Sequence, residues 1–436
     1  MADFFTIAGL DGRKTLEGTI RVGGAKNAVL PALAASLLFA DDVRLENVPA
    51  IEDVARMREL LSGLGVLSQE DGARALRLSP AGAGGFALDE EAAKRMRASI
   101  VLTGPLLARF GRAEFPHPGG DVIGPRPIDL FLDGFRKMGA SVTELGGRYA
   151  VAAEGGLKGT DIFFPVISVT GTETLMLAAV LARGETTLRN AAMEPEIEHL
   201  AAFLNACGAR IEGAGTPTMT VRGAPSPKGL LKARGKAYRT LPDRIEAGSF
   251  LILGALAAKD LVIADCMPEH LAALIELLAA SGVPVSAEKN ALRIRGNGAL
   301  PNRKFKALSV RTHEYPGFAT DLQPPMTVFL TQVTGEGSVF ETIWGGRLNY
   351  TEDLVKMGAD ITLWNPQQAT VKGPTPLSGK ELESPDIRAG LAFVIAATVA
   401  KGKSVINNVY HIDRGYGYIE RRLRDIGVSI ERVSTL

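Results

Sequence analysis

The chain has 436 residues, of which 46% are hydrophobic and 22% are charged. This length predicts two or more domains, and the composition is typical of a globular protein with a large core. The formal net charge of +1 argues against a nucleic-acid partner, because no overall basic excess is present. The apolar runs are too short to span a bilayer, and the N-terminus does not resemble a signal peptide. We therefore expect a cytoplasmic protein that does not insert into membranes.

Cysteine and histidine are sparse and scattered. Cys207 and Cys266 each lie in an apolar segment, so we expect both to be buried as small hydrophobic residues. The five histidines and two cysteines show no spacing typical of a zinc site. The sequence therefore indicates neither a bound metal nor a cofactor.

An amphipathic helix that ends at a glycine, followed by a short apolar strand, recurs six times along the chain. Successive glycines lie 69 to 76 residues apart. Glycine at this place fits the left-handed conformation that often ends a helix. The six glycines are Gly65, Gly139, Gly208, Gly282, Gly358 and Gly427.

Each repeat also contains a second helix of small and apolar residues, as in 28–38 and 391–400. Hydrophobicity on all sides predicts that these helices are buried. Short strands such as 43–48 are expected to cover them. Six repeats predict an α/β fold of two domains, each made of three pseudo-symmetric units with buried central helices. We expect one lobe at 24–236 and a second, discontinuous lobe at 1–23 and 237–436.

The buried helices are polar only where they begin. Helix N-termini bind anions, because their amides are free and the dipole is positive there. Threonine, asparagine and aspartate at these places are also common N-caps, whereas lysine and arginine oppose the dipole and are stronger candidates for a function. The polar residues at the six starts are Lys26, Asn27, Arg97, Thr172, Glu173, Asp243, Arg244, Thr320, Asp321, Asp386 and Arg388.

If the units of each domain are related by rotation, these helix starts converge at one end of the domain. Two facing domains would then form a cleft lined by Lys26, Arg97, Arg126, Arg388 and Arg414. So many cations in a protein of nearly zero net charge predict a small anionic ligand that carries phosphate and carboxylate groups.

The segment 117–130, His-Pro-Gly-Gly-Asp-Val-Ile-Gly-Pro-Arg-Pro-Ile-Asp-Leu, is too rich in glycine and proline to be a regular helix or strand. It carries Asp121, Arg126 and Asp129 within nine residues. A glycine-hinged loop with an acid and a cation is typical of a lid over an anionic substrate. Taken alone, the segment is equally compatible with an ordinary surface turn.

Several segments together resemble the enolpyruvyl transferases. They include Gly-Gly-Ala-Lys-Asn from residue 23, the loop 118–130, Leu-Pro-Asp-Arg-Ile-Glu from 241, Tyr-Pro-Gly-Phe-Ala-Thr-Asp-Leu-Gln from 315 and Tyr-His-Ile-Asp-Arg-Gly-Tyr from 410. The resemblance covers essentially the whole chain and implies two inside-out α/β domains with three-fold pseudosymmetry. It implies enolpyruvyl transfer from phosphoenolpyruvate to the 3′-hydroxyl of UDP-N-acetylglucosamine with release of phosphate, the first committed step of peptidoglycan synthesis.

The resemblance also implies roles for individual residues. Lys26, Arg126 and Arg414 would hold the phosphate and carboxylate of phosphoenolpyruvate, and Asp321 would be the general base on the 3′-hydroxyl. Asp121 would complete a catalytic set with Asp321, Lys26 and Arg414. Arg97 and Arg388 would reinforce the positive field. Asn27, Asp321 and Ile343 would contact the sugar nucleotide, with Arg126, Pro127, Asp129 and Leu130 near its uracil and Ser168 and Val169 near its diphosphate. Thr320 and Asp386 are the remaining expected substrate contacts.

Asp121 stands where most members of the family have a cysteine, the residue linked to protonation and product release. A free carboxyl group is largely ionised at neutral pH, whereas a thiol is not. We therefore expect Asp121 to act as an acid only in the closed, ligand-filled site. The antibiotic fosfomycin alkylates the cysteine, so this enzyme should be insensitive to it.

Other departures from the family lie near the acceptor: Thr170 replaces a glycine, Phe131 replaces a histidine, and Gly345 and Gly346 replace glutamate and asparagine. They leave open a different acceptor, either another uridine nucleotide or shikimate 3-phosphate, although the uracil-side motif 126–130 argues against the latter. A catalytically silent anion-binding homologue is a third alternative, which the presence of the base Asp321 and of the phosphate-binding cations Lys26, Arg126 and Arg414 disfavours. We expect a monomer or a weak homo-oligomer.

Overall fold

The computed structural model describes residues 3–121, 123–224, 229–296 and 305–434. The chain divides into two compact units, which we call the N lobe (Gly24–Gly120 and Arg126–Leu241) and the C lobe (Met1–Gly23, Asp121–Pro125 and Pro242–Leu436).

The division differs from the expected one at two places. Strand β13 (Ala237–Arg239) pairs in parallel with β3 (Val43–Glu46), so the chain stays in the N lobe up to Leu241 rather than 236. The short segment Asp121–Pro125 belongs to the C lobe, although we expected the whole loop in the first lobe. Both differences arise from contacts between residues far apart in sequence.

The interior of the N lobe consists of helices whose side chains are almost all buried. Helices α4 and α6 approach so closely that a Cβ on Gly104 would lie 2.2 Å from the carbonyl oxygen of Thr174. Small residues in these helices therefore permit the packing. The central helices are α1 (Lys26–Ala35), the 3₁₀ segment η3 (Arg97–Leu102) continuing into α4 (Thr103–Phe110), and α6 (Val169–Ala179).

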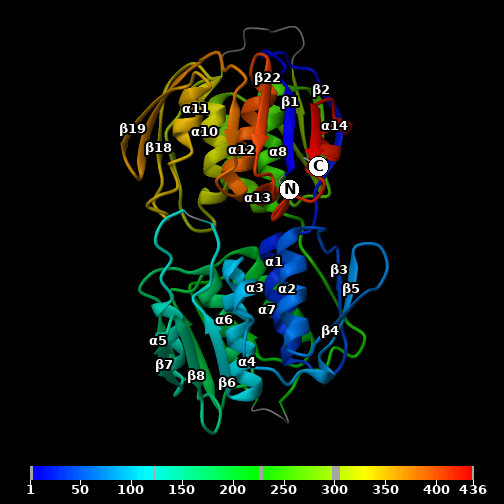
Figure 1. Ribbon diagram of the computed structural model, residues 1–436, viewed down its shortest axis with the longest axis vertical. Coiled ribbons are helices and arrows are strands. Elements are labelled where there is room, and N and C mark those ends of the chain that lie inside the picture. Colours follow the sequence, from blue (N-terminus) through cyan, green and yellow to red (C-terminus); the bar gives the residue numbers. More distant parts are fainter. Residues whose placement is uncertain (1–2, 122, 225–228, 297–304, 435–436) are drawn as a thin grey trace. The chain divides into compact units, whose positions relative to one another are not determined.

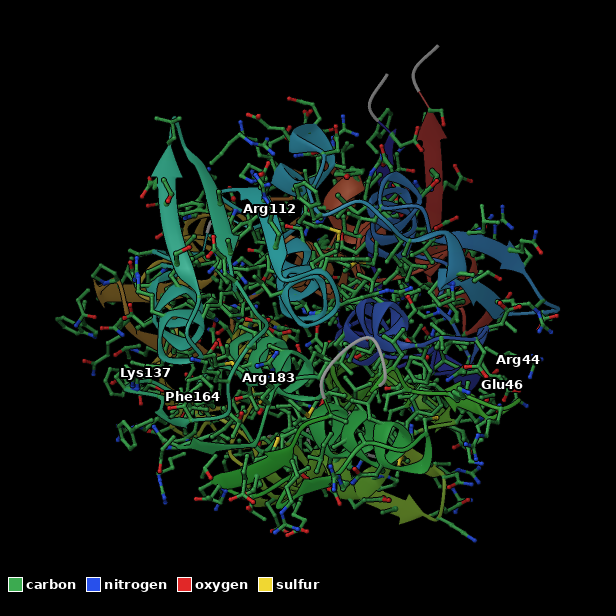
Figure 2. All side chains as sticks on the ribbon, turned by 90° about the horizontal axis from the view of Figure 1, so that it is seen from below. Arg44, Glu46, Arg112, Lys137, Phe164 and Arg183 are labelled. Carbon is green, nitrogen blue, oxygen red and sulfur yellow. The ribbon has the colours of Figure 1, made fainter. Side chains whose placement is uncertain are left out.

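Amphipathic helices and three sheets cover this interior. Figure 2 labels Arg44 and Glu46 on β3, which form an ion pair at the edge of the view. Phe164, which follows β9 and is also labelled, is buried. The outer helices are α2 (Glu52–Gly63), α3 (Glu90–Lys94), α5 (Asp129–Lys137) and α7 (Pro195–Ala206). The sheets have the orders β13-β3-β5-β4, β6-β8-β7 and β11-β12-β10-β9. Their further strands are β4 (Leu67–Glu70), β5 (Ala75–Ser79), β6 (Arg112–Pro116), β7 (Ser141–Leu145), β8 (Arg148–Ala152), β9 (Asp161–Phe163), β10 (Glu185–Arg189), β11 (Ile211–Glu212) and β12 (Thr218–Arg222).

The C lobe repeats this plan. Figure 1 draws α8, α10 and α12 side by side, with β1, β18 and β22 outside them. The central helices are α8 (Arg244–Ala257), η5 (Thr320–Leu322) continuing into α10 (Gln323–Thr331), and α12 (Ile387–Val399). The outer helices are η4 (Pro268–Leu271), α9 (Ala272–Ser281), α11 (Thr351–Lys356), α13 (Tyr410–Asp413) and α14 (Ile419–Asp425).

The three sheets of the C lobe have the orders β21-β22-β1-β23, β15-β16-β14-β2 and β17-β18-β20-β19. Their strands are β1 (Asp3–Ala8), β2 (Leu16–Arg21), β14 (Ala258–Ala264), β15 (Val285–Glu288), β16 (Ala291–Arg295), β17 (Val310–Arg311), β18 (Gly335–Phe340), β19 (Asp360–Asn365), β20 (Gln368–Gly373), β21 (Glu381–Glu383), β22 (Lys403–Asn407) and β23 (Ser429–Ser434).

All six sheets share one topology, which makes the sequence repeat visible in the structure. In five of them, one strand pairs in parallel with the end of an antiparallel three-stranded stretch. In the sixth, β6-β8-β7, the parallel pairing is a single bridge between Ala87 and Glu114. The predicted fold of two inside-out α/β domains, each of three units around buried helices, is confirmed.

The helix-ending glycines are confirmed as well. All six predicted glycines have φ between 89° and 110°, a left-handed conformation that glycine adopts without the steric cost of a side chain. Cys207 and Cys266 are buried and free, as expected. No helix in the described part of the chain is long and apolar enough to cross a membrane.

Candidate active site

Two of the predicted helix starts in the C lobe carry aspartate N-caps. One oxygen of Asp386 accepts hydrogen bonds from the amides of Arg388 (2.7 Å) and Ala389 (3.0 Å). Asp243 caps α8 in the same way. These contacts satisfy amides that a helix start would otherwise leave free. The structure therefore gives both aspartates a structural role at their helix starts.

The two threonines do not cap their helices. The hydroxyl of Thr172 accepts a hydrogen bond from the distant amide of Ala192 (3.0 Å). The hydroxyl of Thr320 donates to Glu341 (2.8 Å) and accepts from Arg347 (3.0 Å). The reading of these threonines as simple N-caps is wrong, because each is part of a tertiary contact.

Asp321 lies at the centre of an ion-pair cluster in the C lobe. Arg347 donates to one carboxylate oxygen (2.9 Å), and Arg388 donates to the other (2.9 Å). Arg388 also donates to the hydroxyl of Tyr416 (2.8 Å). The arginine side chains are only 3% and 4% exposed, whereas that of Asp321 is 23% exposed. The carboxylate is thus oriented from within the lobe and remains accessible to a ligand.

Carboxylates stabilise the charge of both buried arginines. Burial alone lowers the pKa of a guanidinium, but the net pKa of Arg388 is raised well above its ordinary value because Tyr416, Asp321 and Asp243 lie near it. The pKa of Arg347 is also raised, since Asp321 and its neighbouring carboxylates outweigh burial. The C lobe therefore contains cations that are compensated by its own acids.

Glu341 organises this cluster, although the sequence analysis did not single it out. Its fully buried carboxylate accepts hydrogen bonds from the amides of Ile343 (2.9 Å) and Trp344 (3.1 Å) and from the hydroxyls of Thr312 (3.1 Å) and Thr320 (2.8 Å). It therefore places the backbone of Ile343, a predicted substrate contact. The available signal was an acidic residue directly after an apolar strand.

Asp121 forms an ion pair with Arg414 in the C lobe. The two side chains are 14% and 5% exposed, so this is a largely buried charge pair. His411 lies close by, and burial lowers its pKa while Asp121 opposes that shift. Two of the predicted catalytic residues are thus in direct contact, despite being far apart in sequence.

In the N lobe, Lys26 begins α1 and forms an ion pair with Asp53 at 3.1 Å. Asp53, in the first turn of α2, is 3% exposed, and Lys26 is 15% exposed. Asp53 was not among the predicted site residues, since an acid in the first turn of a helix has an ordinary explanation in the dipole. Asn27 follows Lys26 and is partly exposed.

Arg97 and Arg126 lie near each other in the N lobe. A Cβ on Gly120 would lie 2.9 Å from the Cβ of Arg97 and 3.1 Å from a terminal nitrogen of Arg126. Burial and the charge of Arg126 lower the pKa of Arg97 to about 10. Arg97 donates a hydrogen bond to the carbonyl of Pro127 (2.9 Å) and lies over the ring of Phe131. The structure therefore brings together three predicted residues, two of which are cations.

The remaining predicted residues of the N lobe gather at the start of α6. Ser168 is its N-cap and accepts a hydrogen bond from the amide of Gly171 (3.1 Å). The side chain of Leu130 packs on Gly171, because a Cβ there would lie 2.5 Å from Leu130. Val169 begins the helix, while Asp129 begins α5 and is exposed. No group of three His, Cys, Asp or Glu side chains suited to a metal ion occurs among the residues described.

The fold and these clusters define an enolpyruvyl-transferase-like protein. The family model for EPSP synthase (3-phosphoshikimate 1-carboxyvinyltransferase) matches residues 10–423. The chain belongs to this family.

Curated relatives are more specific. UDP-N-acetylglucosamine 1-carboxyvinyltransferase from Solibacter usitatus is 43% identical over 97% of this chain and 99% of its own length. The protein of the same name from Acidobacterium capsulatum is 44% identical over 98% of this chain and 95% of its length. Among solved structures, the enolpyruvyl transferase NikO from Streptomyces tendae aligns with this chain over the full length of both proteins. The TM-score is 0.87 and the sequence identity is 22%.

Proposed function

We propose that this protein is a UDP-N-acetylglucosamine 1-carboxyvinyltransferase. It is a transferase that moves the enolpyruvyl group of phosphoenolpyruvate to the 3′-hydroxyl of UDP-N-acetylglucosamine and releases phosphate, the first committed step of peptidoglycan synthesis. The observation that carries this proposal is the full-length identity of 43% and 44% to enzymes of that name. The accessible carboxylate of Asp321, held by two buried arginines, supports it.

In this proposal, Asp321 is the general base. A carboxylate can take the proton of the acceptor hydroxyl as the oxygen forms its bond to the enolpyruvyl carbon. As that bond forms, the methylene carbon of phosphoenolpyruvate takes a proton from Asp121. The bond from the central carbon to the phosphate oxygen then breaks, the methylene carbon gives up a proton to restore the double bond, and phosphate leaves with the proton taken from the acceptor hydroxyl. Arg347 and Arg388 orient Asp321 without covering it. Ile343, whose amide is bound by Glu341, supports the acceptor.

The cations hold phosphoenolpyruvate. Lys26, Arg97 and Arg126 of the N lobe carry charge that suits its phosphate and carboxylate groups. Arg414, which forms an ion pair with Asp121 within the C lobe, is assigned to the same substrate. Asp121 is the proton donor at the position where most of the family has a cysteine.

The other predicted residues complete the proposed substrate site. Asp386 and Thr320 hold Arg388 and Arg347 in place through the helix start and a hydroxyl contact. The sugar nucleotide is assigned to the remaining residues, which are Asn27, Pro127, Asp129, Leu130, Ser168 and Val169. We further propose a cytoplasmic enzyme that works as a monomer or weak homo-oligomer.

One assay tests the reaction and its acceptor together. Phosphate release from phosphoenolpyruvate is measured with UDP-N-acetylglucosamine, with UMP or with shikimate 3-phosphate. Turnover with UDP-N-acetylglucosamine alone supports the proposal. Turnover only with UMP would indicate another uridine nucleotide as the natural acceptor, and the replaced residues Phe131, Thr170, Gly345 and Gly346 would then be the first to examine. Tight ligand binding without turnover would identify a silent homologue.

A further inference from the structure

The backbone of Gly345 and Gly346 is in close contact with the residues that follow Asp121. The amide of Gly346 donates a hydrogen bond to the carbonyl of Ile123 (3.2 Å). A Cβ on Gly124 would lie 3.2 Å from the amide nitrogen of Gly346 and 3.4 Å from that of Gly345. Two short backbone segments of the C lobe thus pack directly on each other, with no side chain between them.

The glycines differ in what a side chain would meet. A Cβ on Gly346 would lie 3.3 Å from the amide nitrogen of Gly124 and 3.4 Å from the carbonyl carbon and oxygen of Ile123. A Cβ on Gly345 would meet nothing within 4 Å. A side chain is therefore crowded only at the second glycine, where its neighbours would have to give by a few tenths of an ångström. Those neighbours are backbone atoms, which cannot turn aside as a side chain could.

The turn that carries these glycines is fixed at both ends. On one side, Glu341 accepts hydrogen bonds from the amides of Ile343 and Trp344. On the other side, the side chain of Arg347 donates to Asp321 (2.9 Å). A turn held this way forms a rigid surface, so a segment that packs on it is placed relative to Asp321.

The segment on the other side of the contact carries Asp121. Ile123 is only 6% exposed, and Asp121, two residues before it, reaches Arg414. A continuous path of contacts therefore runs from the proposed base Asp321 through Arg347 and Gly346 to Ile123, next to the proposed acid.

We infer that Gly346 is a positioning residue whose missing side chain lets the Ile123–Gly124 backbone seat on the 343–347 turn and so places the acid Asp121 relative to the base Asp321. The inference rests on the proposed function for its catalytic consequence, but the seating itself is a property of the C lobe. Because the proposed proton transfers need both groups in fixed geometry, a shift of the seat affects turnover more than substrate binding.

Matched pairs of variants test this inference: Gly346→Ala and Gly346→Val against Gly345→Ala and Gly345→Val. Hydrogen exchange of the peptide covering 119–126 reports seating without requiring activity. We expect exchange there to rise in the Gly346 series, more for valine than for alanine, and to stay at the wild-type level in the Gly345 series. Thermal unfolding midpoints check that all four variants fold. If Gly346→Val does not fold, the test is made with Gly346→Ala.

Kinetics then connect seating to catalysis. We expect kcat of Gly346→Val to fall by about 10- to 100-fold, as misplaced groups do, with KM for phosphoenolpyruvate changed by less than about two-fold. Equal exchange and equal kcat in the two series would overturn the inference. If wild-type protein has no turnover with any acceptor, the proposed function fails, while exchange still decides whether Gly346 seats the segment.

Discussion

The buried arginines Arg347 and Arg388 of the C lobe and Arg97 of the N lobe sit in opposite electrostatic environments. In the C lobe, Arg347 and Arg388 are buried against carboxylates, and their pKa values are raised. In the N lobe, burial and a second arginine lower the pKa of Arg97 to about 10. Carboxylates thus lie against Arg347 and Arg388 in the C lobe, whereas Arg97 in the N lobe lies near the like charge of Arg126, which disfavours its ionised form.

The difference indicates a division of labour between the lobes. Paired charges hold one another in fixed positions, which suits the orientation of a base such as Asp321. Cations held near each other bind an added anion more strongly, because the anion relieves their repulsion. In the proposed function, the substrate phosphate is therefore assigned to the vicinity of Arg97 and Arg126.

The largest effect is expected from Asp321→Ala, which removes the acid from the C-lobe cluster. Arg347 and Arg388 would each lose one of their partners, so the free energy of unfolding should fall by about 3–5 kcal/mol. Loss of the base should lower turnover by about 10²- to 10⁴-fold. Asp321→Asn separates the two effects, because the amide keeps one hydrogen-bond acceptor but cannot serve as a base. Asp360→Asn, on an exposed strand position, is the control for urea unfolding and phosphate release.

Arg347→Met and Arg97→Met test the comparison directly. Arg347→Met leaves a carboxylate without one of its partners, so we expect a loss of about 3–5 kcal/mol in unfolding free energy. Arg97→Met relieves repulsion with Arg126 and keeps apolar volume, so its stability should stay within about 1 kcal/mol of wild type or rise. Urea titration measures both variants. Similar losses of unfolding free energy would show that the different surroundings of Arg347 and Arg97 do not affect stability differently.

Added phosphate should sharpen the same contrast. If phosphate binds beside Arg97 and Arg126, as proposed, millimolar phosphate should raise the thermal unfolding midpoint of wild type, since a ligand that binds only the folded state stabilises it. Arg97→Met should lose much of this gain. An equal rise of the unfolding midpoint in wild type and Arg97→Met would show that phosphate does not bind beside Arg97.

Fosfomycin tests the assignment of Asp121, whose carboxylate forms an ion pair with Arg414. The wild-type enzyme should keep its activity in the drug, because a carboxylate at position 121 lacks the thiolate nucleophile of a cysteine. Asp121→Cys should become sensitive, with time-dependent loss of at least about tenfold in phosphate release. Rapid inactivation of the wild type would contradict the assignment of Asp121 to the cysteine position.

The smallest effect on stability is expected at Glu173, a buried glutamate of the N lobe. Burial, Glu196 and Glu194 raise the pKa of Glu173 well above its ordinary value of 4.5. Above pH 4.5 the unfolded chain loses this proton more readily than the folded chain does. The free energy of unfolding therefore falls as the pH rises above 4.5.

Glu173→Gln should therefore gain stability relative to wild type at pH 8, and the gain should shrink toward pH 4.5. Urea unfolding at both pH values measures the difference, with the exposed Glu154→Gln as the control. A gain that does not change with pH would show that Glu173 titrates normally in the folded protein.

Much of the fold could be predicted because it depends on local properties. A helix that is apolar on every side must be buried, and a glycine that ends a helix adopts positive φ within its own turn. The six glycines and the caps Asp243 and Asp386 are features of this kind. The sequence repeat likewise anticipated the shared topology of the six sheets.

The sequence by itself therefore determined which segments are buried, how often the unit repeats and which residue types stand at the helix starts. Only the tertiary structure decided their pairings: Asp321 meets partners 26 and 67 residues away, and Asp121 meets Arg414 across 293 residues. It also assigned 121–125 to the C lobe and revealed Glu341 as the group that holds Thr320 and Ile343. Such contacts depend on how separate repeats pack, because a local pattern specifies the burial of its own element but not the neighbour that element will meet.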